Sequence, residues 1–128
     1  MRMGEREWGR QYWPTIEQPT VGETFEEAVA RWLRAQPHLG RVKLPRCAEA
    51  FGLAEYGLRN RLLARGQHYQ DLLDMERLLR LERLLREEPR ANGVDAAQEL
   101  GFSCGDVFRK WYQRHYGVLW KNREVVGV

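Results

Sequence analysis

Two stretches of the chain, AEAFGL at residues 48–53 and AQELGF at residues 97–102, decide the fold because they repeat one order of residue types. Each stretch begins with a small residue, continues with polar and apolar residues, and ends with a glycine followed by a second apolar residue. A glycine adopts a positive φ without a steric penalty, so it suits the tight turn between two short helices. The repeat therefore predicts two similar helix-turn-helix units.

The helices outside the repeat follow from capping signals and from the spacing of apolar residues. Thr24 and Glu27 have the spacing of a capping box, and apolar residues recur at helical intervals up to Pro37, which predicts a helix over about 25–36. A later Leu-rich stretch predicts a long connecting helix over about 69–88. Strand-like alternation is absent from the sequence, so the expected fold class is all-α.

Two further signals delimit the second helix of the second unit. Ser103 and Asp106 have the spacing of another capping box, which predicts the start of this helix. Gly117 predicts its end. Asp106 has an alternative role as well, because a carboxylate can accept a hydrogen bond from cytosine N4, but the helix cap is the simpler interpretation.

These elements divide the chain into an N-terminal arm, residues 1–22, and one helical domain, residues 23–128. We expect the first unit at about 24–66 and the second unit at about 94–124, on either side of the connecting helix. A helix of about 19 residues spans roughly 28 Å. The major groove of B-DNA repeats every ~34 Å, so one chain has the length to present two helices to adjacent turns of the groove.

The second helix of each unit carries polar side chains next to its apolar anchor. Arginine donates a bidentate pair to guanine, asparagine does the same for adenine, and lysine reaches guanine or a phosphate. Alone, such residues are most simply a solvated helix face, but their place in the repeat favours contact with DNA. The candidates for base contact are Tyr56, Arg59, Asn60, Arg109 and Lys110. Tyr56 is equally compatible with packing against the first helix.

The charge distribution agrees with this interpretation. The net charge is +3 and the pI is about 9.1, and the basic excess lies after residue 40, because residues 1–40 hold more Glu than Arg. This excess is too small to establish nucleic-acid binding by itself. Basic residues near the two units are candidates for phosphate contact, which fixes register without carrying sequence information. They are Arg41, Lys43, Arg46, Arg61, Arg65, Arg114, Lys121 and Arg123.

Over about residues 25–123, the chain resembles the DNA-binding domain of the AraC family of transcriptional regulators. The resemblance in the second unit rests on Ala97, Leu100, Gly101, Phe102, Ser103, Phe108, Lys110, Tyr112, Gly117 and Val118. In the first unit it rests on Ala48, Phe51, Gly52, Leu53, Leu58, Leu62 and Gly66. In the connecting helix it rests on Tyr69, Leu72, Leu73, Arg77, Leu84 and Leu85.

The resemblance implies a sequence-specific regulator of transcription that reads two adjacent major-groove segments of double-stranded DNA. The short stretch before the first unit makes the chain similar to the MarA/SoxS type, which implies binding as a monomer without a small-molecule sensor. Three features depart from the family pattern. They are Ala54 in place of a Ser or Thr helix cap, extra residues around 89–93, and Leu119-Trp120 in place of a polar residue and proline.

Catalysis, cofactors and metal binding are not expected. The sequence has no phosphate-binding glycine loop, and His38, His68 and His115 are far apart without Cys or carboxylate residues at ligand spacing. Cys47 and Cys104 are too few for a secreted disulfide framework, which indicates the cytoplasm and, for a DNA binder, the nucleoid. Charges interrupt the Leu-rich stretch at almost every turn, so no membrane-spanning segment is expected.

Two other functions are compatible with the same fold. One is a DNA-organising protein at a partition or origin site of a plasmid or phage. The other is a protein-interaction module that docks through the aromatic arm of Trp8, Tyr12 and Trp13. The same arm is a candidate contact for RNA polymerase or another protein in a DNA-bound regulator. The Leu-rich helix is short for a coiled coil, and burial against both units explains its wide apolar stripe more simply.

Overall fold

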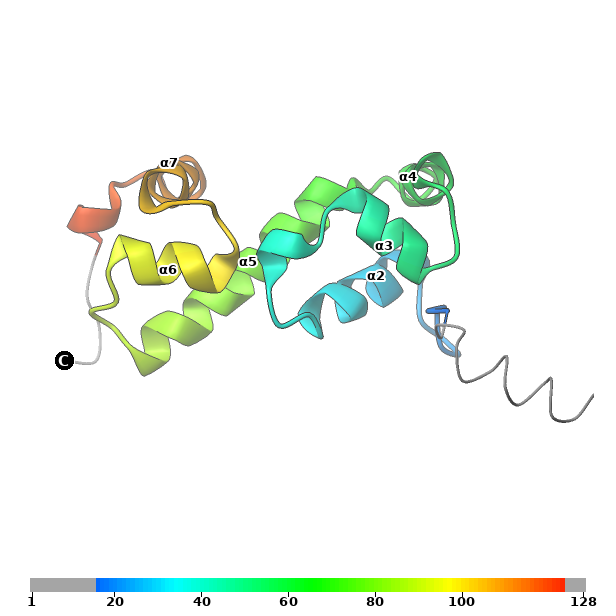
Figure 1. Ribbon diagram of the computed structural model, residues 1–128, viewed down its shortest axis with the longest axis horizontal. Helices are drawn as coiled ribbons and strands as arrows, with labels where there is room; N and C mark the ends of the chain where they lie inside the picture. Colours follow the sequence, from blue (N-terminus) through cyan, green and yellow to red (C-terminus); the bar gives the residue numbers. More distant parts are fainter. Residues whose placement is uncertain (1–15, 124–128) are drawn as a thin grey trace, which may run out of the picture.

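The computed structural model describes residues 16–123, and all regular structure in this range is helical (Figure 1). The elements are α2 (Phe25–Arg34), η1 (Leu39–Arg41), α3 (Leu44–Ala50), α4 (Glu55–Leu63), α5 (Tyr69–Glu87), α6 (Gly93–Leu100), α7 (Gly105–Tyr116) and η2 (Trp120–Asn122). The all-α prediction is confirmed for this part of the chain. None of the helices within it is long and apolar enough to cross a membrane.

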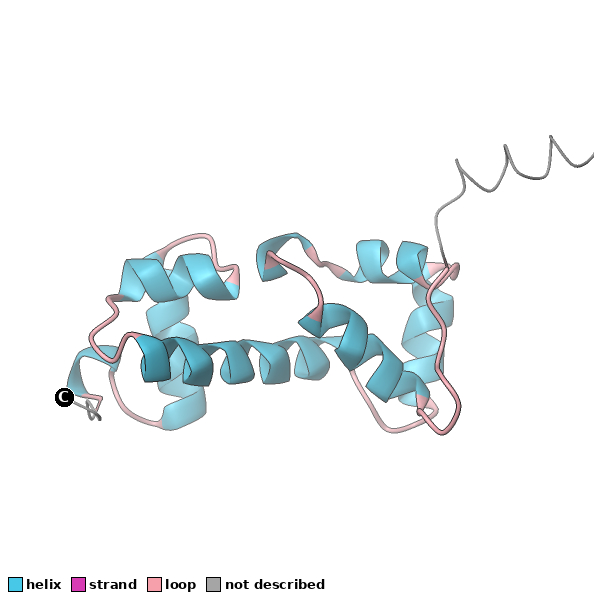
Figure 2. Cartoon of the chain, turned by 90° about the horizontal axis from the view of Figure 1, so that it is seen from below, coloured by secondary structure: helices cyan, strands magenta, loops and turns pink. Residues whose placement is uncertain are grey.

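The long helix α5 is the axis of the molecule, with one group of helices at each of its halves (Figures 1 and 2), and α2 and α6 are the helices that pack most extensively against it. We call α2, η1, α3 and α4 the first unit, and α6, α7 and η2 the second unit. Leu73 on α5 belongs to the hydrophobic core of the first unit, whereas Leu81, about two turns later, belongs to the core of the second. The predicted burial of the Leu-rich helix against both units is confirmed.

The two ends of α2 satisfy their backbone groups in different ways. The predicted capping box is present: the Thr24 hydroxyl accepts a hydrogen bond from the Glu27 amide at 3.2 Å, and the Thr24 amide donates to the Glu27 carboxylate at 2.8 Å. The helix ends at Arg34, before the predicted end at Gln36. Arg80 on α5 donates to the Gln36 carbonyl, so a carbonyl group after α2 is satisfied by another helix rather than by a further turn.

The second unit is joined to α5 by a polar network around Asp74. This carboxylate accepts hydrogen bonds from Trp111 Nε1 on α7 at 3.2 Å and from Arg77 Nη1 at 3.4 Å. Arg77 also donates to the Leu100 carbonyl at 3.1 Å, and its guanidinium lies 4.2 Å from the centroid of the Phe102 ring. These contacts join α5 to the turn between α6 and α7, as well as to α7 itself.

The turn of the second unit is one residue longer than that of the first. As a result, the capping box predicted for Ser103 and Asp106 is wrong. One residue separates the turn glycine from the N-cap Ala54 of α4, whereas two separate it from the N-cap Cys104 of α7. Ser103 therefore precedes the cap, and Asp106 pairs with Arg109 instead of closing a box. The helix α7 therefore begins one residue later than the local capping sequence predicts.

Candidate nucleic-acid interface

The helices α4 and α7 lie along one edge of the molecule and run nearly parallel to each other. Figure 1 views both helices almost end-on at the same edge, and Figure 2, turned by 90°, shows both of them crossing the direction of α5. Each helix packs against the short helix that precedes it, α3 or α6. The exposed faces of α4 and α7 are therefore available to a single extended ligand.

On α4, one face is buried and the opposite face is exposed. Leu58 and Leu62 are buried in the first core. Tyr56, Arg59 and Asn60 are exposed, and their spacing along the helix puts them on one face. Tyr56 is 70% exposed, which excludes the alternative that it packs into the first helix. The three base-contact candidates of the first unit therefore lie together.

On α7, the buried face is aromatic and the exposed face is polar. Phe108 and Trp111 are buried, and the Phe108 ring centroid lies 4.9 Å from that of Trp120 on η2. Both tryptophans belong to the core of the second unit. Arg109 and Lys110 are exposed on the opposite face of the helix.

Two further residues complete these exposed faces and were missed in the sequence. Leu63 on α4 and Gln113 on α7 follow Tyr56 and Asp106, respectively, at two turns' distance and are exposed. The seven-residue interval along a helix was the signal that could have found them. Each exposed face thus extends over about two turns of its helix.

The two helices correspond residue by residue when they are aligned from their N-caps. Arg59 and Arg109 are each the fifth residue of their helix, and Asn60 and Lys110 are each the sixth. The sequence repeat of 48–53 and 97–102 does not show this correspondence, because the longer turn of the second unit shifts it by one residue.

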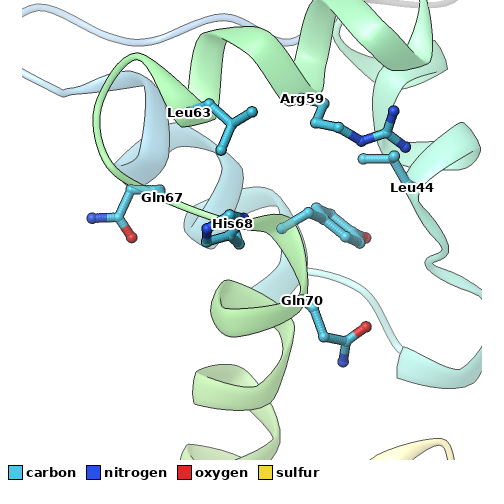
Figure 3. A pocket seen from close by; sticks show the side chains of 7 residues that line it. Leu44, Arg59, Leu63, Gln67, His68 and Gln70 are labelled. Carbon is cyan, nitrogen blue, oxygen red and sulfur yellow. The ribbon is translucent and has the colours of Figure 1, made fainter.

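The surroundings of Arg59 form an open groove. The groove has a volume of about 380 Å³ and lies between the start of α3, the exposed side of α4 and the start of α5 (Figure 3). Leu44, Arg59, Leu63, Gln67, His68, Tyr69 and Gln70 line it. Within residues 16–123, Arg59 takes part in none of the ion pairs, so its guanidinium is available for an external ligand.

The surroundings of Arg109 are different, because a carboxylate and two glycines hold its side chain. Arg109 Nη1 lies 2.9 Å from Asp106 Oδ1, and the two side chains are 45% and 84% exposed, respectively. The guanidinium also lies against Gly93 and Gly105, the first residues of α6 and α7. The Arg109 guanidinium is thus exposed, pairs with one carboxylate and lies where two glycines leave room for it.

Four of the phosphate-contact candidates are exposed and make neither an ion pair nor a cation–π contact within residues 16–123: Lys43, Arg46, Arg114 and Lys121. Lys43 lines a cleft of about 480 Å³ between the two units, together with His38 and Ser103. The cleft is lined on one side by residues before α3 and on the other by the turn before α7. It therefore lies near the middle of the molecule.

The remaining phosphate-contact candidates are occupied by other parts of the protein or are not described. The Arg61 guanidinium lies 5.6 Å from the centroid of the Phe25 ring, and Arg65 pairs with Glu26. Arg123 lies 3.7 Å from the centroid of the Trp120 ring and donates to the carbonyls of Pro89 and Ala91 at 3.2 and 2.8 Å. Burial lowers the pKa of Arg123. The side chain of Arg41 and the aromatic arm of Trp8, Tyr12 and Trp13 lie outside the described residues.

No protein-family model and no curated protein matches the chain. The chain is similar to a solved structure, that of the transcriptional regulator CdpR from Pseudomonas aeruginosa, with a TM-score of 0.66 and 27% sequence identity. The similarity covers 73% of this chain and 29% of that chain, so the chain spans less than a third of the length of CdpR. This similarity supports the class of transcriptional regulators.

Proposed function

We propose that the protein is a sequence-specific regulator of transcription that reads two adjacent major-groove segments of double-stranded DNA. The observation that carries this proposal is the parallel arrangement of α4 and α7 along one edge (Figure 1). A helix-turn-helix places its second helix in the major groove and contacts base edges with the N-terminal residues of that helix. The exposed polar faces of both α4 and α7 support docking of this kind.

The length of α5 supports simultaneous docking of both units. This helix has 19 residues, which corresponds to roughly 28 Å. Successive major grooves on one side of B-DNA are ~34 Å apart. We infer that one copy of the chain spans two adjacent turns of the groove and needs no second copy to do so.

The proposal divides the exposed residues by role. Tyr56, Arg59, Asn60, Arg109 and Lys110 contact bases, because they lie on the exposed faces of α4 and α7. Lys43, Arg46, Arg114 and Lys121 contact phosphates, because they are exposed cations near those two helices or near the cleft between the units. Arg123 is left out of this set because its guanidinium joins η2 to the loop before α6.

Selection of bound duplexes from a random library tests this function. The purified protein is expected to enrich an asymmetric site with two short blocks about one helical turn apart. The affinity for the selected duplex is then compared with that for a scrambled duplex over a range of salt concentrations. Sequence-specific binding typically exceeds non-specific binding by about 10³-fold or more.

Each outcome of the selection distinguishes between modes of action. A single enriched block means that one unit reads bases alone, and an inverted repeat means that two copies bind together. Either result contradicts the two-unit proposal. The absence of any enriched sequence, together with equal affinity for the scrambled duplex, contradicts sequence-specific binding altogether.

A further inference from the structure

The two equivalent arginines, Arg59 and Arg109, differ in how firmly their guanidinium groups are held. In a helix, a long side chain points back toward the N-terminus of its own helix. Arg109 follows this rule, because its guanidinium reaches Gly105, the first residue of α7. The N-terminal end of the second helix is the part of a helix-turn-helix that contacts base edges. The Arg109 guanidinium therefore lies at the end of α7 that faces the groove.

The Arg109 guanidinium can occupy this position because the neighbouring residues 93 and 105 are glycines, which have no side chain. A Cβ added to Gly93 would lie 2.8 Å from Arg109 Nε and 2.9 Å from its Nη2, closer than real Cβ contacts come. A Cβ added to Gly105 would lie 3.1 Å from Nη1. Any side chain at Gly93 therefore displaces the guanidinium from its present position.

Asp106 is the third residue that contacts the Arg109 guanidinium, after Gly93 and Gly105. Its carboxylate accepts a hydrogen bond from Arg109 Nη1 at 2.9 Å, and it lies on the same exposed face of α7. A surface ion pair of this kind adds little to stability. Its effect is on orientation, because an arginine that is already ordered loses less side-chain entropy when it binds.

The first unit has none of these features around Arg59. The residue that corresponds to Gly93, the first of α3, is Leu44, and Tyr56 stands where α7 has Asp106. Arg59 instead lines the open groove beside Leu44 (Figure 3). The two units thus present an arginine at the same helix position, which pairs with a carboxylate in the second unit and forms no ion pair with the described residues in the first.

We propose that Asp106 and Gly93 are positioning residues that hold Arg109 as a pre-organised reader of guanine in the second half of the DNA site. This inference rests on the proposed function. A bidentate arginine pair is directed at guanine O6 and N7, and its specificity depends on the direction of the guanidinium. The second unit therefore discriminates one guanine sharply, whereas Arg59 tolerates more than one base.

The test uses the full chain and three variants. Asp106→Asn removes the carboxylate, Gly93→Ala displaces the guanidinium, and Asp95→Asn is the matched control. Asp95 is an exposed acidic residue in the first turn of α6, so its variant changes the charge equally without touching Arg109. Each protein is measured against the duplex selected by the wild type and against duplexes in which every G·C pair of the second block is replaced singly by A·T.

The wild type and Asp95→Asn are expected to prefer guanine at one position of the second block by roughly tenfold or more. Asp106→Asn and Gly93→Ala are expected to lose most of that preference while they retain their affinity for random DNA and their midpoint of thermal unfolding. If both variants keep the full preference, or if the second block contains no preferred guanine, the inference is wrong and the proposed function stands. A wild type that selects no sequence overturns both.

Discussion

The backbones of Gly40 and Gly101 lie directly against each other where η1 meets the end of α6. A Cβ added to Gly101 would come within 2.1 Å of the Gly40 nitrogen. The reverse substitution is tight as well, because a Cβ on Gly40 would lie 2.9 Å from the Gly101 carbonyl oxygen. This contact joins the two units directly, in addition to their shared attachment to α5.

Gly101→Ala is expected to lower the free energy of unfolding by more than the cost of placing an alanine at a positive φ. Gly101 and Gly117 both end a helix with a positive φ, +82° and +74°, but no atom lies within 4 Å of a Cβ added to Gly117. The left-handed conformation costs an alanine roughly 1–2 kcal/mol. Gly117→Ala should lose this amount, and Gly101→Ala should lose a further ~1–3 kcal/mol from overpacking. Equal free energies of unfolding for the two variants would show that the contact between the units adds nothing.

The ion pair between Arg34 and Glu76 is expected to matter more than a surface pair. Glu76 is 2% exposed and accepts two hydrogen bonds from Arg34, at 3.1 and 2.9 Å. Arg34→Met leaves this buried carboxylate without its partner, which should cost about 1.5–3 kcal/mol of stability. Arg31→Met is the control, because its partner Glu23 is more exposed than Glu76, 17% against 2%, and a pair open to solvent contributes about 0–1 kcal/mol. Chemical denaturation measures both values, and a loss no larger for Arg34 than for Arg31 contradicts the account.

Stability is expected to fall at alkaline pH because of Cys47. Burial raises the pKa of this thiol from 9.0 to about 12. The folded state thus holds its proton more tightly than the unfolded state, and the stabilisation is complete below pH 9 and is lost as the pH rises toward 12. At pH 10 the loss is on the order of 1 kcal/mol. The free energy of unfolding at pH 7 and pH 10 measures it, and Cys47→Ala should show a smaller difference. An unchanged difference would assign the effect to another group, such as Tyr69, whose pKa is also raised by burial.

Arg114→Gln is expected to weaken binding to all DNA sequences alike. Arg114 is exposed in the last turn of α7, away from the N-terminal end that we propose to contact bases. Loss of one phosphate contact should reduce the slope of log affinity against log salt by about 1. Arg86→Gln is the matched control, because the C-terminal half of α5 lies on the other side of α6 from α7 (Figure 1). A selective loss for the cognate duplex would instead make Arg114 a base reader.

Much of the fold could be predicted because its signals are local. The Thr24–Glu27 capping box, the apolar stripe of α5 and the glycine that ends α7 each depend on neighbouring residues. The start of α7 could not be predicted in the same way. Ser103 has a good side chain for an N-cap, but the helix begins one residue later, where Cys104 precedes the buried Gly105.

The candidate site was only partly predictable for a related reason. Residue types and periodicity place Arg59 and Arg109 on exposed helix faces, and the structure agrees. The partners that distinguish these two arginines are Leu44 and Gly93, which lie on the preceding helix of each unit. Such contacts depend on how two helices cross, and the sequence pattern of one helix does not contain that information.

The most direct test of the central claim is the affinity of the protein for its selected duplex after five base pairs are inserted between the two blocks. The insertion turns the second block by about half a helical turn away from the first. If one rigid chain reads both blocks, the affinity should fall nearly to that of a duplex with the second block scrambled. An affinity unchanged by the insertion would contradict the claim, because it would mean that the two units do not bind together.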